Sequence, residues 1–579
     1  MQMHMPEPLL DPRARQKRPR LTLAPRVSIE DLRRGKVLFY DNTKLEAGNY
    51  TRIFPRLKEQ FRARGVGNFI DVVQTPRGKG TDDLNHFAAE LASHKPVAAV
   101  VALADIGVTP ATTVITVALE RLGIPAVLIT AGPGVKLAQA VAFYRAGRLC
   151  LCPFDIYQGS TVEEILAESD SHVDYIIECL TLGPSEIERR AIIEFELDKA
   201  PPGDLLPFSE TPSSMPASRE GSTLDPSRAV EPGCCMEEIM EQFCSGYLSD
   251  GLPVIPPTLR RFGQMMAYCP YGPNHVLAHE IGPSGSDITV REVVIAAVMA
   301  GCKPEYVPVL LTAFKALADP KYNLLQAVTT SHPGGDLILV SGPIAQELGI
   351  HGGQGCLGPG FRANATIGRA VNLAITNACR SVPGVADLGC LASQAEYSYC
   401  FAEDPGLTPW KTMNEERFDR DTTCVLVMKA EPPHDIIDFL SSTGGDLLDT
   451  LVDSCTTLGT NNSYMPGNLI LVLTPDHARL LNRNGYTKDR IREHVHQQAH
   501  HPAPMVRNRG LVPVRPPGFD QMHPIPVTRS AQDVEIVVAG GRGGHSAVIL
   551  PWGLHSEAVV EPVSLPEGRL ARSVMEFRR

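Results

Sequence analysis

The segment PVAAVVALADIGVTPATTVITVALERLGIPAVLIT, residues 96–130, predicts a strand, a helix and a second strand in direct succession. Its two ends, 96–103 and 124–130, are short and apolar, whereas 110–122 has the length and composition of a helix. Short apolar strands that alternate with helices are typical of a parallel sheet covered on both faces. The segment therefore predicts an α/β fold.

The same alternation continues on both sides of this segment. VLFYD (37–41) and NFIDVV (68–73) are two further strands, and 135–145 is a helix after the last strand. Because crossovers between parallel strands are right-handed, these elements predict a doubly wound, flavodoxin-like parallel sheet. We assign residues 31–195 to this N-terminal domain.

A linker and a larger domain follow. Residues 196–233 are rich in Pro, Ser and Gly and have no apolar period, which is typical of a flexible linker. Residues 234–562 predict a larger α/β domain. Within it, LILVSGPIAQELGI (337–350) and LILVLTPDHARLL (469–481) share a strand–Pro–helix form, which favours two pseudo-repeats.

Composition restricts the class of partner. The chain has 579 residues, 54 Lys and Arg against 65 Asp and Glu, and a formal net charge of −11. An acidic chain is a poor general nucleic-acid binder, and no apolar run reaches the roughly 18 residues that span a membrane. The 14 cysteines lack the spacing of a disulfide framework, so we expect reduced thiols and a cytoplasmic location. We expect residues 1–30 to form a disordered basic tail and 563–579 a second tail.

Ligand sites in doubly wound sheets lie beyond the carboxyl ends of the strands. Asn42 and Lys44 follow the first strand there, so both are candidates for substrate binding. Residues 105–109 follow the third strand and begin a helix, whose free N–H groups favour an anion. The alternative is that Asn42 and Thr109 only cap helices.

The second domain contains the densest group of chemically useful residues. VTTSHPGGD (328–336) precedes its first predicted strand, and HGGQGCLGPGFRANATIGRA (351–370) follows it. Glycines let a ligand approach the backbone, while Arg and Asn side chains bind carboxylates and carbonyls. The alternative is a tight connection whose arginine pairs with a carboxylate elsewhere. The predicted substrate-binding residues of this domain are Arg362, Asn364, Thr330 and Arg369.

Three side chains are candidates for catalysis. Cys356 lies within the glycine-rich segment and is the best-placed nucleophile, and His332 lies before the strand. Glu403 is a candidate general acid or base, although surface carboxylates are commoner. GGRGGHS (540–546) ends a later strand and predicts either an anion site or a plain turn. We expect no metal site, and we assign no cofactor because no flavin, nicotinamide or pyridoxal motif stands out.

Two parts of the chain resemble the UGSC-like domain family, which is named for a U/C-G-S-C motif after an apolar strand. LADIGVTPATTVITVALERLGIPAVLI and DNTK resemble its first domain. AAVMAGCKPEYVPV, SHPGGDLILVSGP, GPGFRANATIGRA and YCFAED resemble the large domain found with UGSC proteins. The resemblance covers most of residues 36–190 and 245–560.

This chain departs from the family at the motif itself, where it has Ile106-Gly107-Val108-Thr109. Only the glycine is kept, and neither Ile106 nor Thr109 can form a thiolate or selenolate. The resemblance therefore implies a thiol-linked ancestor whose first domain has been repurposed, with any remaining chemistry in the second domain.

These observations favour a small-molecule enzyme of specialised (secondary) metabolite biosynthesis. We expect oxidoreductase or lyase-type chemistry on a substrate that carries a carbonyl or carboxylate, with the site in the second domain near its interface with the first. The alternative is a non-catalytic binding or scaffold protein derived from a thiol-redox family. A homo-oligomer is a further expectation.

Overall fold

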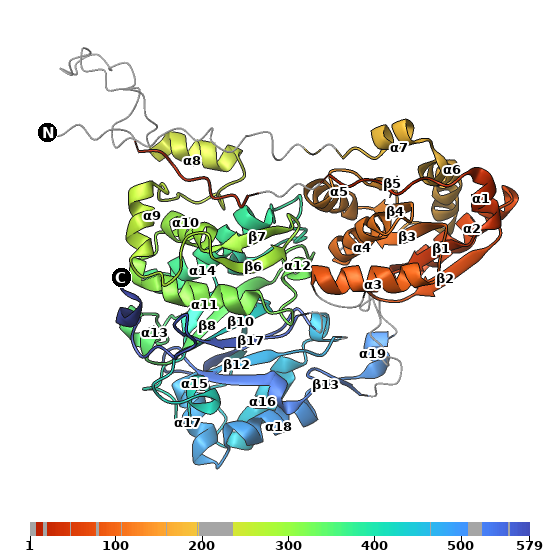
Figure 1. Cartoon of the computed structure of the whole chain (residues 1–579). Helices are drawn as coiled ribbons and strands as arrows, with labels where there is room; N and C mark the ends of the chain where they lie inside the picture. Colours follow the sequence, from red (N-terminus) through yellow and green to blue (C-terminus); the bar gives the residue numbers. More distant parts are fainter. Residues whose placement is uncertain are drawn as a thin grey trace, which may run out of the picture.

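The computed structural model contains two α/β domains that lie side by side, which confirms the predicted fold class (Figure 1). The structure describes residues 7–15, 20–46, 48–76, 80–105, 107–157, 159–193, 195, 236–463, 465–507, 524–553 and 556–579. The predicted linker 196–233 lies outside these residues.

The first domain is built on a five-stranded sheet in which every strand pair is parallel. The strand order is β2-β1-β3-β4-β5, the flavodoxin order, so the direction of winding changes between β1 and β3. The prediction located four of these strands and missed the fifth. The strands are β1 (Val37–Asp41), β2 (Phe69–Val73), β3 (Ala98–Ala104), β4 (Ala126–Ala131) and β5 (Cys150–Phe154).

Helices cover both faces of this sheet, because the strands are apolar on both sides. One face packs against α2 (Ile53–Ala63) and α6 (Val162–Thr181). The other face packs against α3 (Thr81–Ser93), α4 (Thr109–Arg121) and α5 (Gly134–Arg145). Two shorter helices complete the domain, α1 (Ile29–Arg34) and α7 (Pro184–Arg190).

The described residues of the two predicted tails are packed rather than free, which corrects the domain boundaries. The Leu21 N–H donates to Ala146 O at 2.8 Å, and Arg26 forms a buried ion pair with Glu120 at 2.9 Å. Residues 7–15 reach the large domain, where Leu10 N–H donates to Pro257 O. In the C-terminal tail five apolar side chains enter the core of the large domain: Val563, Leu565, Ala571, Val574 and Phe577. Scattered apolar residues, which basic neighbours obscure in the sequence, anchor both segments.

The large domain contains two four-stranded sheets with the same pattern, in support of the two predicted pseudo-repeats. In each sheet a central strand pairs in parallel with one neighbour and antiparallel with the other, and an antiparallel edge strand follows. The first sheet has the order β17 (Val559–Pro562), β10 (Cys424–Ala430), β8 (Gly335–Ser341), β9 (Cys400–Ala402). The second has the order β11 (His434–Ile437), β16 (His545–Ile549), β12 (Leu469–Leu473), β15 (Val534–Val538).

The repeats exchange their edge strands. β11 follows β10 along the chain but joins the second sheet, and β17 follows β16 but joins the first. Neither sheet is therefore complete without a strand from the other repeat.

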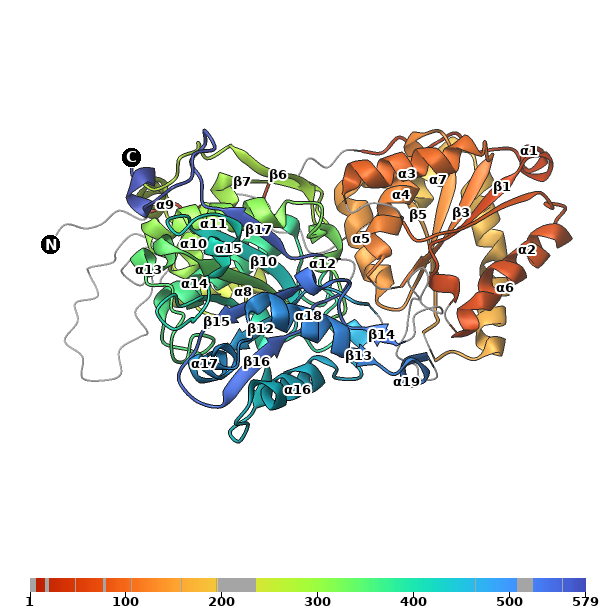
Figure 2. The same ribbon diagram turned by 90° about the horizontal axis from the view of Figure 1, so that it is seen from below.

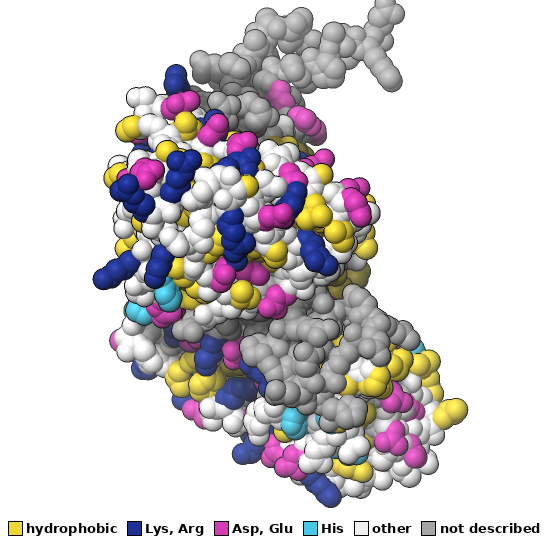
Figure 3. Space-filling model, turned by 90° about the vertical axis from the view of Figure 1, so that its right-hand side faces the viewer, with side chains coloured by type: hydrophobic (Ala, Val, Ile, Leu, Met, Phe, Trp, Pro, Cys, Tyr) yellow, Lys and Arg dark blue, Asp and Glu magenta, His cyan; other side chains and the backbone are white. Residues whose placement is uncertain are grey.

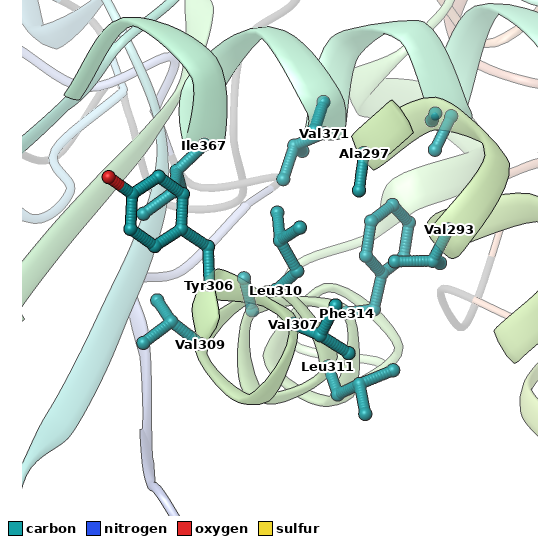
Figure 4. Packing of buried hydrophobic residues seen from close by; sticks show 14 of the residues in the cluster. Val293, Ala297, Tyr306, Val307, Val309, Leu310, Leu311, Phe314, Ile367 and Val371 are labelled. Carbon is teal, nitrogen blue, oxygen red and sulfur yellow. The ribbon is translucent and has the colours of Figure 1, made fainter. Parts of the chain in front are cut away.

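The two sheets pack face to face and helices cover their outer faces, which gives four layers, stacked from top to bottom in Figure 1 and seen from the side of α16 and α18 in Figure 2. The first sheet is covered by α10 (Val290–Ala300), α11 (Val307–Leu317) and α14 (Arg362–Ala374). In Figure 4, Leu310 and Phe314 of α11 point toward α10 and α14. The second sheet is covered by α16 (Gly444–Cys455), α17 (Pro475–Arg483) and α18 (Lys488–Gln498).

Short elements connect these layers. The helices are α8 (Met236–Ser245), α9 (Leu259–Met266), α12 (Leu324–Ala327), α13 (Pro343–Leu348), α15 (Met413–Arg417) and α19 (Ala503–Arg507). The strands are β6 (Val276–Ile281), β7 (Ser286–Thr289), β13 (His500–His501) and β14 (Ile525–Pro526).

A buried cation joins the two domains. Arg145, at the end of α5, donates through Nη2 to Glu280 O at 3.0 Å and Gly282 O at 2.8 Å. Leu325 and Ala386 of the large domain share an apolar cluster with α3 and α4. The segment 325–386, which contains much of the candidate site below, therefore lies partly against the first domain.

The surface carries both signs of charge. Figure 3 shows Lys and Arg interspersed with Asp and Glu over the face it presents. Within the described ranges, no helix combines the length and apolarity needed to cross a membrane.

Candidate active site

A buried ion pair lies at one end of the first sheet. Asp336 of β8 and Lys429 of β10 are paired in register, and Nζ lies 3.5 Å from Oδ1. Their side chains are only 5% and 7% exposed. The Tyr322 hydroxyl donates to the same carboxylate, and burial beside that carboxylate raises the pKa of Tyr322. Because burying two charges costs more than a plain apolar contact, this pair suggests a role beyond stability.

Two further carboxyl groups lie close by, and neither forms an ion pair with another described residue. Burial, together with the nearby Asp387 charge, raises the pKa of Glu396 to about 7 against the opposing effect of Lys429. Burial also raises the pKa of Asp387, whose Oδ1 accepts the Gly389 N–H at 3.0 Å. The Glu396 carboxyl accepts no hydrogen bond from a described residue. A carboxyl group with a pKa near 7 exchanges protons readily at neutral pH.

His332 lies on the loop between α12 and β8, where the Thr330 hydroxyl accepts its backbone N–H at 3.1 Å. Its Nε2 lies 3.1 Å from Glu431 Oε1, and the side chain is 7% exposed. His332 Nδ1 and Ser393 Oγ are buried without a partner among the described residues. Unsatisfied buried polar atoms are costly, and a bound ligand or water would satisfy them.

These residues line one cavity of about 240 Å³, which we call the carboxyl cavity. Thr330, His332, Asp336, Asp387, Glu396 and Lys429 form part of its wall. The rest includes Ser249, Asp250, Asn372, Ile375, Thr376, Ser381, Ser393 and Tyr397. Its volume lies just below the usual range of small-molecule pockets.

The backbone around the carboxyl cavity departs from regular geometry. α14 ends in a π-helical turn, Ile375–Cys379, and the first two residues of that turn line the cavity. Arg380 and Ala392 have positive φ angles of 57° and 54°, although neither is glycine. π-turns and residues in the left-handed region are concentrated at functional sites, so this geometry also favours a functional role.

The carboxyl cavity suits proton transfer. It places a carboxyl group with a pKa near 7 beside a second carboxyl, a buried ammonium group and an imidazole. Across the described ranges, no group of three or more His, Cys, Asp or Glu side chains is arranged to hold a metal ion.

Of the predicted substrate-binding residues, Thr330 lines this cavity, whereas the other three in the large domain bind the protein itself. Arg362 donates through Nε and Nη2 to Gly301 O, at the end of α10. Asn364 donates to His351 O and Cys356 O, so it holds the glycine-rich segment in place. Arg369 forms a bidentate pair with Asp250 at 2.7 and 2.8 Å, and Asp250 lines the cavity.

The three predicted catalytic residues lie apart. His332 lines the carboxyl cavity, but Cys356 lies in a second cavity, where burial raises its pKa to about 11. Glu403 is buried within a closed network: it accepts from the Ser341 hydroxyl and the Met413 N–H, and Lys488 Nζ lies 3.6 Å away. The structure therefore does not bring the three candidate side chains together in one site.

The first-domain candidates lie at the carboxyl ends of β1 and β3, as predicted, but their side chains are engaged. Asn42 is buried, donates to Leu103 O and Thr112 Oγ1, and accepts from Leu103 N–H. Lys44 Nζ lies 3.8 Å from Asp105 Oδ1. Thr109 is the first residue of α4 and makes no cap, and Ile106 lies outside the described residues.

Sequence reasoning missed Asp336, Asp387, Glu396 and Lys429. A signal was present for two of them, because Asp336 and Lys429 are charged residues within otherwise apolar strands. Asp387 lies in a loop and Glu396 ends a short 3-10 helix, so neither has a comparable signal.

No protein-family model, curated protein or solved structure matches the chain. The resemblance to the UGSC-like family stays a prediction.

Proposed function

We propose that the chain is a small-molecule enzyme whose active site is the carboxyl cavity, and that it catalyses lyase-type proton transfer. The observation that carries the proposal is Glu396, a half-buried carboxyl on the cavity wall with a pKa of about 7. Titratable groups shifted by burial beside a cavity are concentrated at functional sites.

In this proposal Glu396 is the general base. Its carboxylate removes a proton from a carbon next to a substrate carbonyl or carboxylate. Asp387 lies close enough for its charge to favour the return of that proton to Glu396. The same carboxyl then acts as the acid that protonates a leaving group or product.

Lys429 supplies the balancing charge. Abstraction of such a proton places negative charge on the substrate oxygen, and a buried ammonium group stabilises that charge strongly. Asp336 and the Tyr322 hydroxyl position the ammonium group. His332, held through Nε2 by Glu431, offers Nδ1 as a further hydrogen-bonding group.

The lining of the carboxyl cavity favours the lyase over the oxidoreductase alternative. None of its described residues is a cysteine. Thiol redox chemistry would therefore have to occur elsewhere.

We further propose that the reaction belongs to specialised metabolism and that the first domain is a repurposed UGSC-like domain. Segment 325–386 contacts the first domain, and this contact includes α12 and the start of the loop that contains Asp387. The contact supports a role for the first domain in positioning that part of the carboxyl cavity.

The test compares the metabolites of a deletion strain with those of its parent, and then incubates the accumulating compound with purified protein. We expect conversion by the wild type and by Glu493→Gln, a control on the exposed face of α18, and loss of conversion in Glu396→Gln. Equal turnover in both variants would refute the assignment of the site. Binding without turnover by the wild type would favour the scaffold alternative.

A further inference from the structure

A second cavity lies where the two repeats meet. Two glycine-rich turns, 352–360 and 540–544, are joined by the Gly540 N–H, which donates to Gly352 O at 2.8 Å. Between them, at the carboxyl ends of β12 and β15, is a space of about 340 Å³, which we call the glycine cavity. It is lined by 354–358, 539–543, Val472, Thr474, His545, Ser546 and Ala547. None of these residues lines the carboxyl cavity.

Two backbone N–H groups of the glycine cavity lining, those of Gly541 and Arg542, are without an acceptor among the described residues. The N–H groups of Gly540 and Leu357 lie near the Cys356 sulfur and favour its charged form, although burial outweighs them. Unpaired backbone N–H groups on a glycine-rich turn attract anions.

The second turn is held rigidly, so these groups are preorganised. The Thr474 hydroxyl donates to Gly543 O at 2.8 Å, and Asp476 accepts both the Gly543 N–H and Arg542 Nε at 3.0 Å. A Cβ on Gly541 would lie 2.9 Å from Gln354 Cγ, so a larger residue would push the two turns apart.

The lining differs from that of the carboxyl cavity in its charged residues, and each of its two basic side chains pairs with an aspartate outside the lining, Arg542 with Asp476 and His545 with Asp435. No Asp or Glu lines the glycine cavity among the described residues, and its ionisable side chains with basic groups are Arg542 and His545. By contrast, four acidic residues line the carboxyl cavity: Asp250, Asp336, Asp387 and Glu396.

We propose that the glycine cavity is a binding site for an oxyanion group, the phosphate or carboxylate of a small ligand. The backbone N–H groups of the two turns hold the oxygens and Arg542 supplies the positive charge. The ligand binds separately from the substrate of the carboxyl cavity, so this proposal does not depend on the proposed reaction.

The test is calorimetric titration of the purified full chain with inorganic phosphate and, separately, with acetate. Ala547 lies in register with Val472 on the cavity wall, so Ala547→Leu fills the space. The matched control is Ala558→Leu, because Ala558 packs on the same apolar cluster as Ala547 but does not line the cavity. We expect binding of one probe to be lost in Ala547→Leu and kept in Ala558→Leu.

A second pair of variants tests the charge. Arg542→Gln removes the lining guanidinium, and Arg479→Gln removes another arginine that lies 3.7 Å from the same Asp476 without lining the cavity. We expect about tenfold weaker binding in Arg542→Gln and no change in Arg479→Gln. The probe that binds more tightly identifies phosphate or carboxylate as the preferred group. Absence of binding by both probes, or binding unchanged in Ala547→Leu, would overturn the proposal.

Discussion

Two carboxyl groups flank β9 in opposite situations. Glu396 precedes the strand and Glu403 follows it, and burial raises the pKa of both. Glu403 is closed in by the Ser341 hydroxyl, the Met413 N–H and Lys488. Glu396 has no such partners among the described residues and lines a cavity.

The difference shows that a raised pKa does not by itself mark a reactive group. The Glu403 network holds α15 and α18 against the end of the first sheet, so its carboxyl stabilises the fold. Partial burial of the Glu396 carboxyl destabilises its charged form, and no hydrogen bond or ion pair with a described residue compensates for this. Such an uncompensated group is typical of a functional site.

The largest expected effect is on turnover. Glu396→Gln should lower kcat by about 10²- to 10⁴-fold, because the amide cannot exchange the proton. Glu403→Gln should keep turnover within a few-fold and unfold at a lower temperature than the wild type, because it weakens the pair with Lys488. Steady-state kinetics and thermal unfolding of both variants measure this. Comparable losses of kcat in the two variants would contradict the assignment of a catalytic role to Glu396 and a structural role to Glu403.

The next largest effect is on stability and involves the lysine beside each carboxyl group. Lys429→Met leaves the buried Asp336 carboxylate without its cation, and Lys488→Met removes the ammonium group that lies beside Glu403 and Glu416. Each change should cost about 3–5 kcal/mol of unfolding free energy, which denaturant titration measures. Under conditions where both variants are folded, only Lys429→Met should also lose turnover. Normal turnover in that variant would remove Lys429 from the proposed mechanism.

The sequence predicts the scaffold better than the site for a physical reason. Strand–helix alternation is local, so 37–41 was located with the bounds of β1, and the shared strand–Pro–helix segments anticipated the repeats. The carboxyl cavity instead combines loops, helix ends and two strands, and no local pattern shows that Glu396 approaches Asp387 and Lys429. Arg362 and Asn364 were predicted to bind a ligand, but in the structure Arg362 binds the carbonyl at the end of α10 and Asn364 holds a loop. The same side-chain donors serve both purposes, so residue type alone does not distinguish them.

A smaller expected effect is a pH dependence of the unfolding free energy that is caused by Glu396. The pKa of Glu396 rises from an ordinary 4.5 to about 7 in the folded protein. The folded state therefore binds the proton more tightly, so the contribution of Glu396 to stability is full below pH 4.5 and is lost as the pH rises to about 7. Because Gln does not ionise, Glu396→Gln should be about 1–3 kcal/mol more stable than the wild type at about pH 8, with little difference at about pH 4. Denaturant titrations at the two pH values measure this gain. A variant that is less stable than the wild type at the higher pH would contradict the predicted cost of ionising Glu396.

The smallest effect concerns Cys356, a third buried titratable group. Burial raises its pKa to about 11, so only about one thiol in 10⁴ is ionised at pH 7. Cys356→Ala should therefore leave turnover nearly unchanged, and iodoacetamide should modify Cys356 slowly at neutral pH. The exposed Cys390 serves as the internal control, since reagent reaches it freely. Mass spectrometry of the alkylated protein compares the two sites. Rapid, selective modification of Cys356 together with loss of turnover in Cys356→Ala would transfer the chemistry from the carboxyl cavity to the glycine cavity.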